Sequence, residues 1–443
     1  MRRAVDIVDL AQGGEGVGRL DERAVFVPYA APGDRVTVEV PEGVGPAHAR
    51  LVEVLQPGAA RVEAPCRHFG PGAHAGCGGC EWLHVAYAAQ LAAKQRFLAE
   101  TLRRIGGLAP GSYQAPEIIP SPSPLRYRAR AKFHVDRGTG RLVFFRRRSH
   151  EPVDIRECHL LEPELDALRE AIGPALARAR LAPREVTLEW SRHSGRGSAF
   201  LQLPSTGSSA RQRAEELLAV LPALQGVVLG AEGSPLERVG DPVLRQARRP
   251  DDPAGELQRS RPDVFQQANR RGNALLVDAA LGLLRPEGED VLELFCGAGN
   301  FTGPLAIRAR SVHAVEAQGP ALDLARLDLE EWAAGDVSSR RSKVRLFAGD
   351  ALALARAFAR EKGPARRFGA ALLDPPREGC RGIGRALREL EVPRAVYVSC
   401  DPATLARDLK ACGEAGYRVE AVQAVDMFPQ THHVEGVALL VAG

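Results

Sequence analysis

The chain has 443 residues, of which 45% are hydrophobic and 26% are charged, and its formal net charge is +4. These values are ordinary for a globular protein of two or three domains. No apolar run approaches the roughly 18 residues of a membrane span, and the N-terminus has no apolar segment typical of a secretory signal. We therefore expect a cytoplasmic protein that does not interact with a membrane.

Short alternating strands predict a small β-barrel over residues 1–58, an architecture common among nucleic-acid-binding domains. The strand patterns are VDIVDL, AVFVPYA and DRVTVEV, and glycine-rich turns separate them. A second unit is expected over residues 59–260. It contains a helical pattern at about 85–105, a β-hairpin in KFHVDRGTGRLVFF, and further strands and helices.

Positive charge is concentrated between Arg126 and Arg148. Nine arginine and lysine residues stand here against one acid, Asp136, and four aromatic residues are interleaved with them. Arginine beside aromatic side chains is what a surface needs to bind the phosphates and bases of nucleic acid. A solvated sheet edge in an arginine-rich protein explains the same strip equally well.

From residue 261 to residue 443 the pattern becomes that of a doubly wound, mostly parallel α/β sheet. The buried-strand candidates are DVLELF (290–295), SVHAVEA (311–317), KVRLFAG (343–349), GAALLDP (369–375), RAVYVSC (394–400) and GVALLVA (436–442). Helical patterns separate most of them. The sequence therefore predicts a Rossmann-like domain, in which ligands bind at the carboxyl ends of the strands.

A glycine-rich turn, ELFCGAGNFTGPLA, joins the first of these strands to the next helix. Gly297 and Gly299 permit a tight turn and close approach of a ligand. Glu316 ends the next strand, where a carboxylate can accept hydrogen bonds from both ribose hydroxyls. A dinucleotide-binding loop would have glycine in place of Thr302, so the motif favours S-adenosylmethionine over NAD. Asp350 is a candidate for binding the adenine amino group, and a helix N-cap explains it as well.

Two motifs at later strand ends carry reactive side chains. LLDPPREG directs Asp374 into the crevice, and Arg377 stands where amino-group methyltransferases have an aromatic residue. Cys400 ends the following strand just before a helix, whose N-terminus is expected to lower the thiol pKa. Most cysteines of apolar segments are structural, a role we assign to Cys296 and Cys412. A thiolate at the ligand-binding edge suits methylation of pyrimidine C5, because addition at C6 makes C5 nucleophilic.

This chemistry also requires a base that removes the C5 proton. DMFPQTHHVEGVALL supplies Glu435 immediately before the last strand, where partial desolvation is expected to raise its pKa. An ordinary acid at the start of a strand is the alternative. His433 is expected to be a local hydrogen-bonding residue rather than a base.

Together and in this order, these motifs resemble those of the RNA uracil-5-methyltransferases, in the branch with an N-terminal TRAM domain and an iron–sulfur cluster. The resemblance covers nearly the whole chain: DLAQGGEGVGRL…AVFVPYAAPGD is similar to the TRAM signature, and ELFCGAGNFT, LLDPPREG, VYVSCDPATLARDL and DMFPQTHHVE to family motifs. It implies that Cys400 is the nucleophile and Glu435 the base. The cofactor-site residues that it implies are Gln267, Phe295, Asn300, Glu316, Asp350 and Asp374.

Four of the eight cysteines match the ligands of a [4Fe–4S] cluster in the same resemblance. They are Cys66, Cys77, Cys80 and Cys158. The first spacing is longer than is usual in the family, with PGAHA (71–75) as an insertion. Structural zinc is the rival interpretation, but only Cys77 and Cys80 have the short spacing typical of zinc sites. Asp401 is a second departure, because the family commonly has asparagine there; it keeps a polar helix cap and adds negative charge near the thiol.

The sequence therefore predicts an α/β enzyme with a TRAM domain (1–58), a central α+β domain with the cluster (59–260) and an S-adenosylmethionine-dependent methyltransferase domain (261–443). The expected product is 5-methyluridine in structured RNA, and the arrangement of TRAM domain and cluster favours 23S ribosomal RNA. RNA is expected to bind the barrel and the Arg126–Arg148 strip, with the target base flipped out of its stack. The alternatives are a transfer RNA methyltransferase with the same mechanism and a non-catalytic RNA-binding or folding factor. No obligate protein partner is expected.

Overall fold

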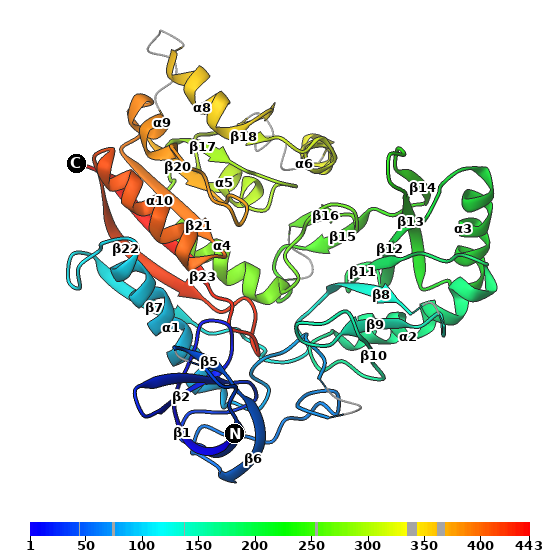
Figure 1. The fold of residues 1–443 in the computed structure, drawn as a ribbon. Helices are drawn as coiled ribbons and strands as arrows, with labels where there is room; N and C mark the ends of the chain where they lie inside the picture. Colours follow the sequence, from blue (N-terminus) through cyan, green and yellow to red (C-terminus); the bar gives the residue numbers. More distant parts are fainter. Residues whose placement is uncertain (44, 73–75, 137, 253–255, 335–342, 361–367) are drawn as a thin grey trace.

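The computed structural model describes residues 1–43, 45–72, 76–136, 138–252, 256–334, 343–360 and 368–443. Three large sheets, of six, seven and eight strands, organise the chain (Figure 1). No helix within these ranges combines the length and the apolar character that crossing a membrane requires.

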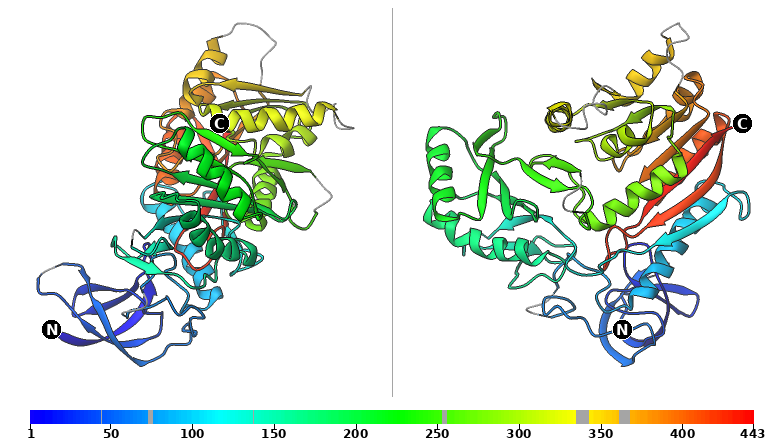
Figure 2. Two further views of the ribbon diagram at one scale, coloured as in Figure 1. Left: turned by 90° about the vertical axis from the view of Figure 1, so that its right-hand side faces the viewer. Right: turned by 180° about the vertical axis from the view of Figure 1, so that it is seen from behind.

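The N-terminal sheet curves strongly, as the predicted barrel requires (Figure 2). Its strand order is β5-β3-β2-β1-β4-β6. The strands are β1 (Arg2–Leu10), β2 (Gly16–Leu20), β3 (Arg23–Val27), β4 (Arg35–Glu39), β5 (Ala47–His48) and β6 (Arg50–Gln56). Alternate residues such as Val25, Val27, Val36 and Val38 are fully buried, so one face of each strand builds the core.

The central sheet has the order β10-β9-β8-β11-β12-β13-β14. Its strands are β8 (Arg130–Val135), β9 (Leu142–Phe145), β10 (Pro152–Asp154), β11 (Glu185–Ser191), β12 (Arg196–Gln202), β13 (Leu224–Gly230) and β14 (Glu237–Gly240). Helices α2 (Pro163–Arg178) and α3 (Ser208–Val220) share its core. β8 and β9 pair antiparallel, which confirms the predicted hairpin. A ribbon of β15 (Leu244–Ala247) and β16 (Leu257–Ser260) leads on to the catalytic domain.

The catalytic sheet has the order β19-β18-β17-β20-β21-β23-β22-β7, and each predicted strand is present in it. Its strands are β17 (Asp290–Leu294), β18 (Ser311–Glu316), β19 (Val344–Ala348), β20 (Ala370–Leu373), β21 (Arg394–Ser399), β22 (Tyr417–Val425) and β23 (Glu435–Ala442). The first five strands in that order run parallel, whereas β23 is antiparallel to both of its neighbours. One core holds α4 (Arg270–Leu284), α5 (Thr302–Arg308) and α6 (Gly319–Ala334), and a second holds α8 (Ala351–Arg360), α9 (Ile383–Glu389) and α10 (Pro402–Glu414).

A segment from early in the chain completes this sheet. β7 (Gln114–Ile119) pairs parallel with β22, and α1 (Tyr87–Arg104) buries Leu98 and Leu102 in the core that α10 also lines. α1 confirms the predicted helix. The segment 87–119 is nevertheless part of the catalytic unit, so the predicted central domain of 59–260 does not hold over this stretch.

α1 also fixes the loop that follows β22. Lys94 Nζ lies 2.6 Å from Asp426 Oδ1, and neither side chain is exposed to solvent. The Tyr87 hydroxyl donates a hydrogen bond to Asp426 Oδ2 at 2.8 Å, and Lys94 donates a second one to the Phe428 carbonyl at 2.9 Å. Because both side chains that bind this buried carboxylate lie on α1, the helix determines where the loop begins.

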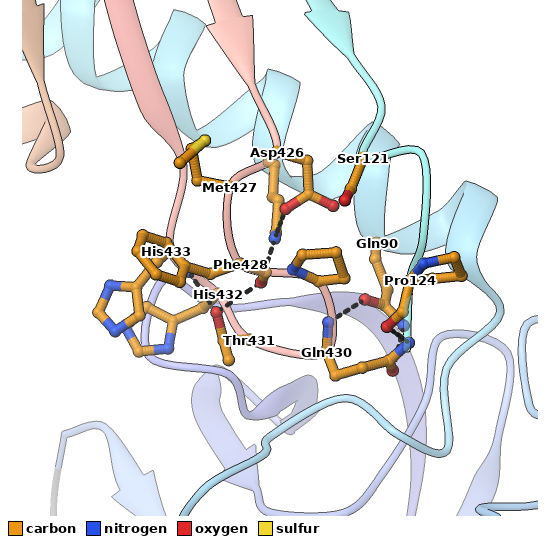
Figure 3. A network of polar contacts seen from close by, with 12 residues as sticks. Gln90, Ser121, Pro124, Asp426, Met427, Phe428, Gln430, Thr431, His432 and His433 are labelled. Carbon is orange, nitrogen blue, oxygen red and sulfur yellow. Dashed lines mark hydrogen bonds and ion pairs between the residues drawn. The ribbon is translucent and has the colours of Figure 1, made fainter. Parts of the chain in front are cut away.

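Gln430 is the second anchor of the 426–433 loop (Figure 3). Its backbone N–H donates to Gln90 Oε1 of α1 at 3.0 Å. Its carbonyl accepts hydrogen bonds from the backbone N–H groups of Glu81 and Trp82, each at 3.0 Å. Those two residues directly follow Cys80, so the cysteine-rich loop is tied to the 426–433 loop.

Removing the ammonium group of the buried pair should destabilise the catalytic unit strongly. We expect Lys94→Ala to lower the free energy of unfolding by about 3–5 kcal/mol, because it leaves the Asp426 carboxylate buried without a countercharge. Denaturant-induced unfolding measures the loss. The control is Lys410→Ala, which truncates an exposed lysine on α10, and the double variant Lys94→Met, Asp426→Leu should recover most of the stability. A loss no larger than that of the control would show that the pair is not an anchor.

Candidate active site

The predicted reactive residues lie just beyond the carboxyl ends of neighbouring parallel strands. Phe295 follows β17, Glu316 ends β18, Asp374 follows β20 and Cys400 follows β21. β18, β17, β20 and β21 are adjacent in this order. Because parallel strands point the same way, these side chains gather at one edge of the sheet, where α/β proteins bind ligands.

Strand register brings Cys400 and Glu435 together. Ser399, the last residue of β21, pairs with Gly436 on the antiparallel strand β23. Cys400 therefore emerges beside Glu435, the first residue of β23. Glu435 is buried and Cys400 is half-buried. The structure thus places the predicted nucleophile and the predicted base next to each other.

Burial dominates the electrostatics of this pair. It raises the pKa of the Cys400 thiol to about 11, and the negative charge of Glu435 adds to the effect. Burial also raises the pKa of Glu435 to about 8, with a smaller contribution from Asp374. The pKa of Asp374 itself rises to about 7 through desolvation. The expected lowering of the Cys400 pKa by the helix N-terminus is therefore wrong, because the loss of hydration outweighs it.

Arg377 is a functional residue to which the sequence analysis gave no role. Its guanidinium lowers the pKa of Cys400 through its charge and a hydrogen bond to the thiol, and its charge also lowers the pKa of Glu435. It is therefore the cation that stabilises both anions of the pair. The signal in the sequence for this role was the position of Arg377 directly after Asp-Pro-Pro at the end of a strand.

The helix that follows Cys400 is capped as expected. Asp401 is the N-cap of α10, and its Oδ1 accepts a hydrogen bond from the Thr404 N–H at 2.7 Å. The aspartate therefore performs the capping that an asparagine would perform.

The glycine loop and Glu316 form one hydrogen-bonded unit. Gly297 and Gly299 have φ angles of 55° and 87°, in the region that glycine tolerates best. Glu316 Oε2 accepts a hydrogen bond from the Gly297 N–H at 2.9 Å, and its Oε1 accepts one from the Gln318 N–H at 2.8 Å. A carboxylate oxygen can accept a second hydrogen bond. Glu316 is thus held in position and keeps capacity for a ribose hydroxyl.

Glu293, which the sequence analysis did not single out, lies beneath this loop. It is fully buried on β17, and burial raises its pKa to about 8. Its Oε2 accepts a hydrogen bond of 2.7 Å from the hydroxyl of Thr302. The residue in place of the third glycine therefore has a structural role, because it donates a hydrogen bond to one oxygen of this buried acid. An acid within an otherwise apolar strand was the signal.

The other predicted cofactor residues lie on separate elements of the catalytic domain. Asn300 exchanges two side-chain hydrogen bonds, of 2.8 and 3.0 Å, with Asn273 of α4. Asp350 Oδ1 accepts a hydrogen bond from the Ala353 N–H at 2.8 Å, so the helix N-cap explanation describes this exposed acid. Gln267 is half-buried in the coil before α4, and Phe295 is half-buried at the end of β17.

Four cysteines converge in the central part of the molecule. Cys66, Cys77, Cys80 and Cys158 line one cavity of about 120 Å³. The pKa of Cys80 is raised mainly by burial, and the charges of the other three thiols add to the effect. Within the ranges that the structure describes, however, no group of three or more His, Cys, Asp and Glu side chains is arranged to hold a metal ion. Residues 73–75 of the predicted insertion lie outside those ranges.

Much of the Arg126–Arg148 strip serves internal contacts. Arg130 donates to the Pro262 carbonyl at 2.7 Å, and Arg126 donates to the Cys158 carbonyl at 2.8 Å. Lys132 pairs with Glu185 at 2.6 Å. Arg137 lies outside the described residues. The C-terminal end is paired as well, because Arg148 Nη1 lies 3.2 Å from Glu15 Oε1 and Arg146 Nε lies 3.0 Å from Glu151 Oε1. Among the described residues, the strip is therefore not a continuous row of free cations.

Comparison with known proteins identifies the family. The sequence profile described as tRNA (uracil-5-)-methyltransferase matches residues 256–442, and that of the TRAM domain matches residues 2–43. A Pseudomonas putida protein named 23S rRNA (uracil(1939)-C(5))-methyltransferase RlmD is 35% identical over 458 aligned positions, which cover 100% of this chain and 94% of that protein. The chain belongs to the RNA uracil-5-methyltransferase family.

Two further relatives of this methyltransferase agree with that assignment. A Nitrosospira multiformis protein with the same name is 34% identical and is covered over 98% of its length by 99% of this chain. The crystal structure of Pyrococcus abyssi tRNA (uracil-54, C5)-methyltransferase in complex with S-adenosyl-L-homocysteine superposes with a TM-score of 0.73 at 23% identity, over 99% of both chains. The predicted fold, an α/β methyltransferase domain with an N-terminal TRAM domain, is therefore confirmed.

Two charged groups near the thiol of this methyltransferase should change its rate of alkylation in opposite directions. At a pH above the Glu435 pKa of about 8, Arg377→Gln should slow alkylation of Cys400 by iodoacetamide, because it removes the cation that stabilises the thiolate. Glu435→Gln should accelerate alkylation, because it removes a repelling carboxylate. Each change should be roughly tenfold for a shift of one pKa unit.

The measurement is mass spectrometry of the Cys400 peptide over time. The matched control is Arg381→Gln, an exposed arginine of the same loop, which should leave the rate unchanged. Equal rates in all three variants would mean that neither charge acts on the thiol.

Proposed function

We propose that this methyltransferase transfers a methyl group from S-adenosylmethionine to C5 of a uridine in 23S ribosomal RNA, in the cytoplasm. The relatives that carry this activity in their names match nearly the full length of the chain. The observation that carries the chemistry is the pairing of Ser399 with Gly436, which sets a thiol beside a buried carboxylate at the strand-end edge.

The first step is addition of Cys400 to the pyrimidine ring. The thiolate forms a bond to C6, and the ring electrons move toward C5 and the C4 oxygen, which gives an enolate. Because burial raises the pKa of the thiol to about 11, the thiolate needs a partner of opposite charge. Arg377 supplies it and so lowers the cost of forming the nucleophile.

The second step methylates C5 and releases the product. When bound, S-adenosylmethionine supplies the methyl group as an electrophile. The Glu435 carboxylate then removes the C5 proton, the C6–S bond breaks, and the C5=C6 double bond and the thiolate are restored. A pKa of about 8 makes Glu435 a stronger base than an exposed glutamate, so this step should speed up as the pH rises through that value.

The strand-end edge also offers the groups that a nucleoside cofactor needs. We assign the ribose hydroxyls to Glu316, because two backbone N–H groups orient its carboxylate. Gly297 and Gly299 leave space for close approach to the turn. Gln267, Phe295, Asn300, Asp350 and Asp374 are proposed to complete the binding site.

We further propose that Cys66, Cys77, Cys80 and Cys158 bind a [4Fe–4S] cluster. All four line one cavity, and a thiol donor set suits iron–sulfur clusters. Thiolates on one zinc ion lie about 3.8 Å apart, given a Zn–S distance of about 2.3 Å. The four corners of a cluster separate thiolates more widely. A cavity of about 120 Å³ that all four cysteines line has room for a group of several atoms, which favours the cluster over zinc.

Incubation of the enzyme with methyl-labelled S-adenosylmethionine and either ribosomal or transfer RNA tests the substrate. We expect label in one uridine of 23S ribosomal RNA. Cys400→Ala should abolish transfer, whereas Glu435→Gln should accumulate a covalent protein–RNA adduct on a denaturing gel, because the C5 proton cannot leave. Label confined to transfer RNA would support the alternative substrate, which is the kind of RNA named for the Pyrococcus enzyme.

Two matched variants control this experiment. Cys412→Ala removes a buried thiol from the neighbouring helix α10, and Glu420→Gln neutralises an exposed acid on β22. Both should methylate RNA as the unaltered enzyme does. If the enzyme binds RNA and transfers no label to any RNA, the chain is a non-catalytic RNA-binding factor.

Anaerobic reconstitution with iron and sulfide tests the cluster. The enzyme should retain about four iron and four acid-labile sulfide per chain, and Cys80→Ser should retain much less because it removes one thiolate. Cys412→Ser, at a cysteine outside the cavity, should retain the full amount. Purified protein with one zinc and no sulfide per chain would show that the four cysteines bind zinc and not a cluster.

A further inference from the structure

A second pocket lies where four parts of the chain meet, and we call it the junction pocket. Its volume is about 550 Å³. The residues that line it include Gly13 of the turn between β1 and β2, Gly78 and Gly79 of the cysteine-rich loop, Phe145 of β9 and His432 of the 426–433 loop. A cavity of this size accommodates a nucleotide-sized ligand.

We propose that the junction pocket binds one unpaired nucleotide of the RNA substrate, close to the target uridine, with its base stacked on Phe145 and His134 and its phosphate held by Arg147 and Arg148. This proposal rests on the proposed function and adds a position for a second nucleotide.

The charge of the lining suits a phosphate. Lys132, Arg146, Arg147 and Arg148 line the pocket, and Glu81 is the acid among the described residues of its wall. Arg148 also pairs with Glu15 at 3.2 Å and Lys132 with Glu185 at 2.6 Å, so a phosphate would share these two cations with carboxylates. Arg147 Nη2 donates to the Gly13 carbonyl at 2.8 Å. Its Nη1 is buried and has no hydrogen-bond partner among the described residues. An unsatisfied guanidinium donor is costly, and a phosphate oxygen would satisfy it with a charge-assisted hydrogen bond.

The aromatic side chains of the pocket suit a base. The rings of His134 and Phe145 stack with their centroids 3.9 Å apart and their planes within 15°. His150 meets the Phe145 ring edge-on at 5.5 Å, which limits its rotation. Both stacked residues are half-buried. Flat aromatic surfaces beside arginines are the usual platform for an unpaired base, whatever its identity.

The location links the junction pocket to the reaction. His432 precedes Glu435 by three residues, a stretch of chain that spans at most about 11 Å. His432 Nδ1 also lies 3.6 Å from Glu81 Oε2, and both residues line the pocket. A nucleotide in this pocket is therefore a near neighbour of the uridine at Cys400, and its binding would help to hold the target base out of its stack.

Binding of a short single-stranded RNA, followed by fluorescence anisotropy, tests the proposal without methyl transfer. Phe145→Leu should weaken binding roughly tenfold, because the stacking surface is lost. Arg147→Gln should weaken binding and reduce the slope of log affinity against log salt by about one, because one phosphate contact is lost. Arg211→Gln, at an exposed arginine of α3, should change neither quantity.

Crosslinking provides a second measurement that needs no substitution. RNA that contains photoreactive 5-iodouridine should crosslink to the peptide containing Phe145, identified by mass spectrometry. Unchanged affinity in both variants, or adducts confined to other peptides, overturns the proposal even if the enzyme methylates uridine. Weakened binding together with an enzyme that methylates no RNA leaves the pocket in place and overturns the proposed reaction instead.

Discussion

The buried ion pair between Lys94 and Asp426 is the constraint on which the arrangement of the molecule depends. Neither side chain contacts solvent, so each charge is stable only while the other is present. The pair fixes α1 to the 426–433 loop. The same loop accepts hydrogen bonds from the segment after Cys80 and leads directly into Glu435. The position of the proposed base is thus set by contacts from two distant parts of the chain.

Desolvation is the common cause of the unusual acid–base properties of the site. Cys400, Glu435 and Asp374 all have raised pKa values because burial removes part of their hydration. Such an environment makes a carboxylate a better base and makes a thiolate harder to form. Arg377, which is exposed to solvent, offsets the second effect. The balance between burial and one nearby cation therefore determines how readily the thiolate forms.

The sequence predicted local features well and long-range ones poorly. Runs such as VYVSC and GVALLVA revealed β21 and β23, because buried strands have a distinctive composition. The family motifs identified Cys400 and Glu435, and the strand register confirms that they lie together. The sequence did not reveal that β7 joins the catalytic sheet, since pairing of Gln114 with Ala421 leaves no local pattern. It also gave no way to tell which arginines of the Arg126–Arg148 strip are used internally, because those partners come from other segments.

The contribution of β7 to the edge of the catalytic sheet has a consequence for biosynthesis. β7 and α1 are synthesised long before β22, the strand with which β7 pairs. Until α10 and β22 are made, the apolar face of α1 and the open edge of β7 lack their partners, and exposed edges of this kind promote aggregation. The catalytic sheet is therefore completed by two strands that are far apart in the sequence, and such non-local pairing predicts slow folding of the methyltransferase unit.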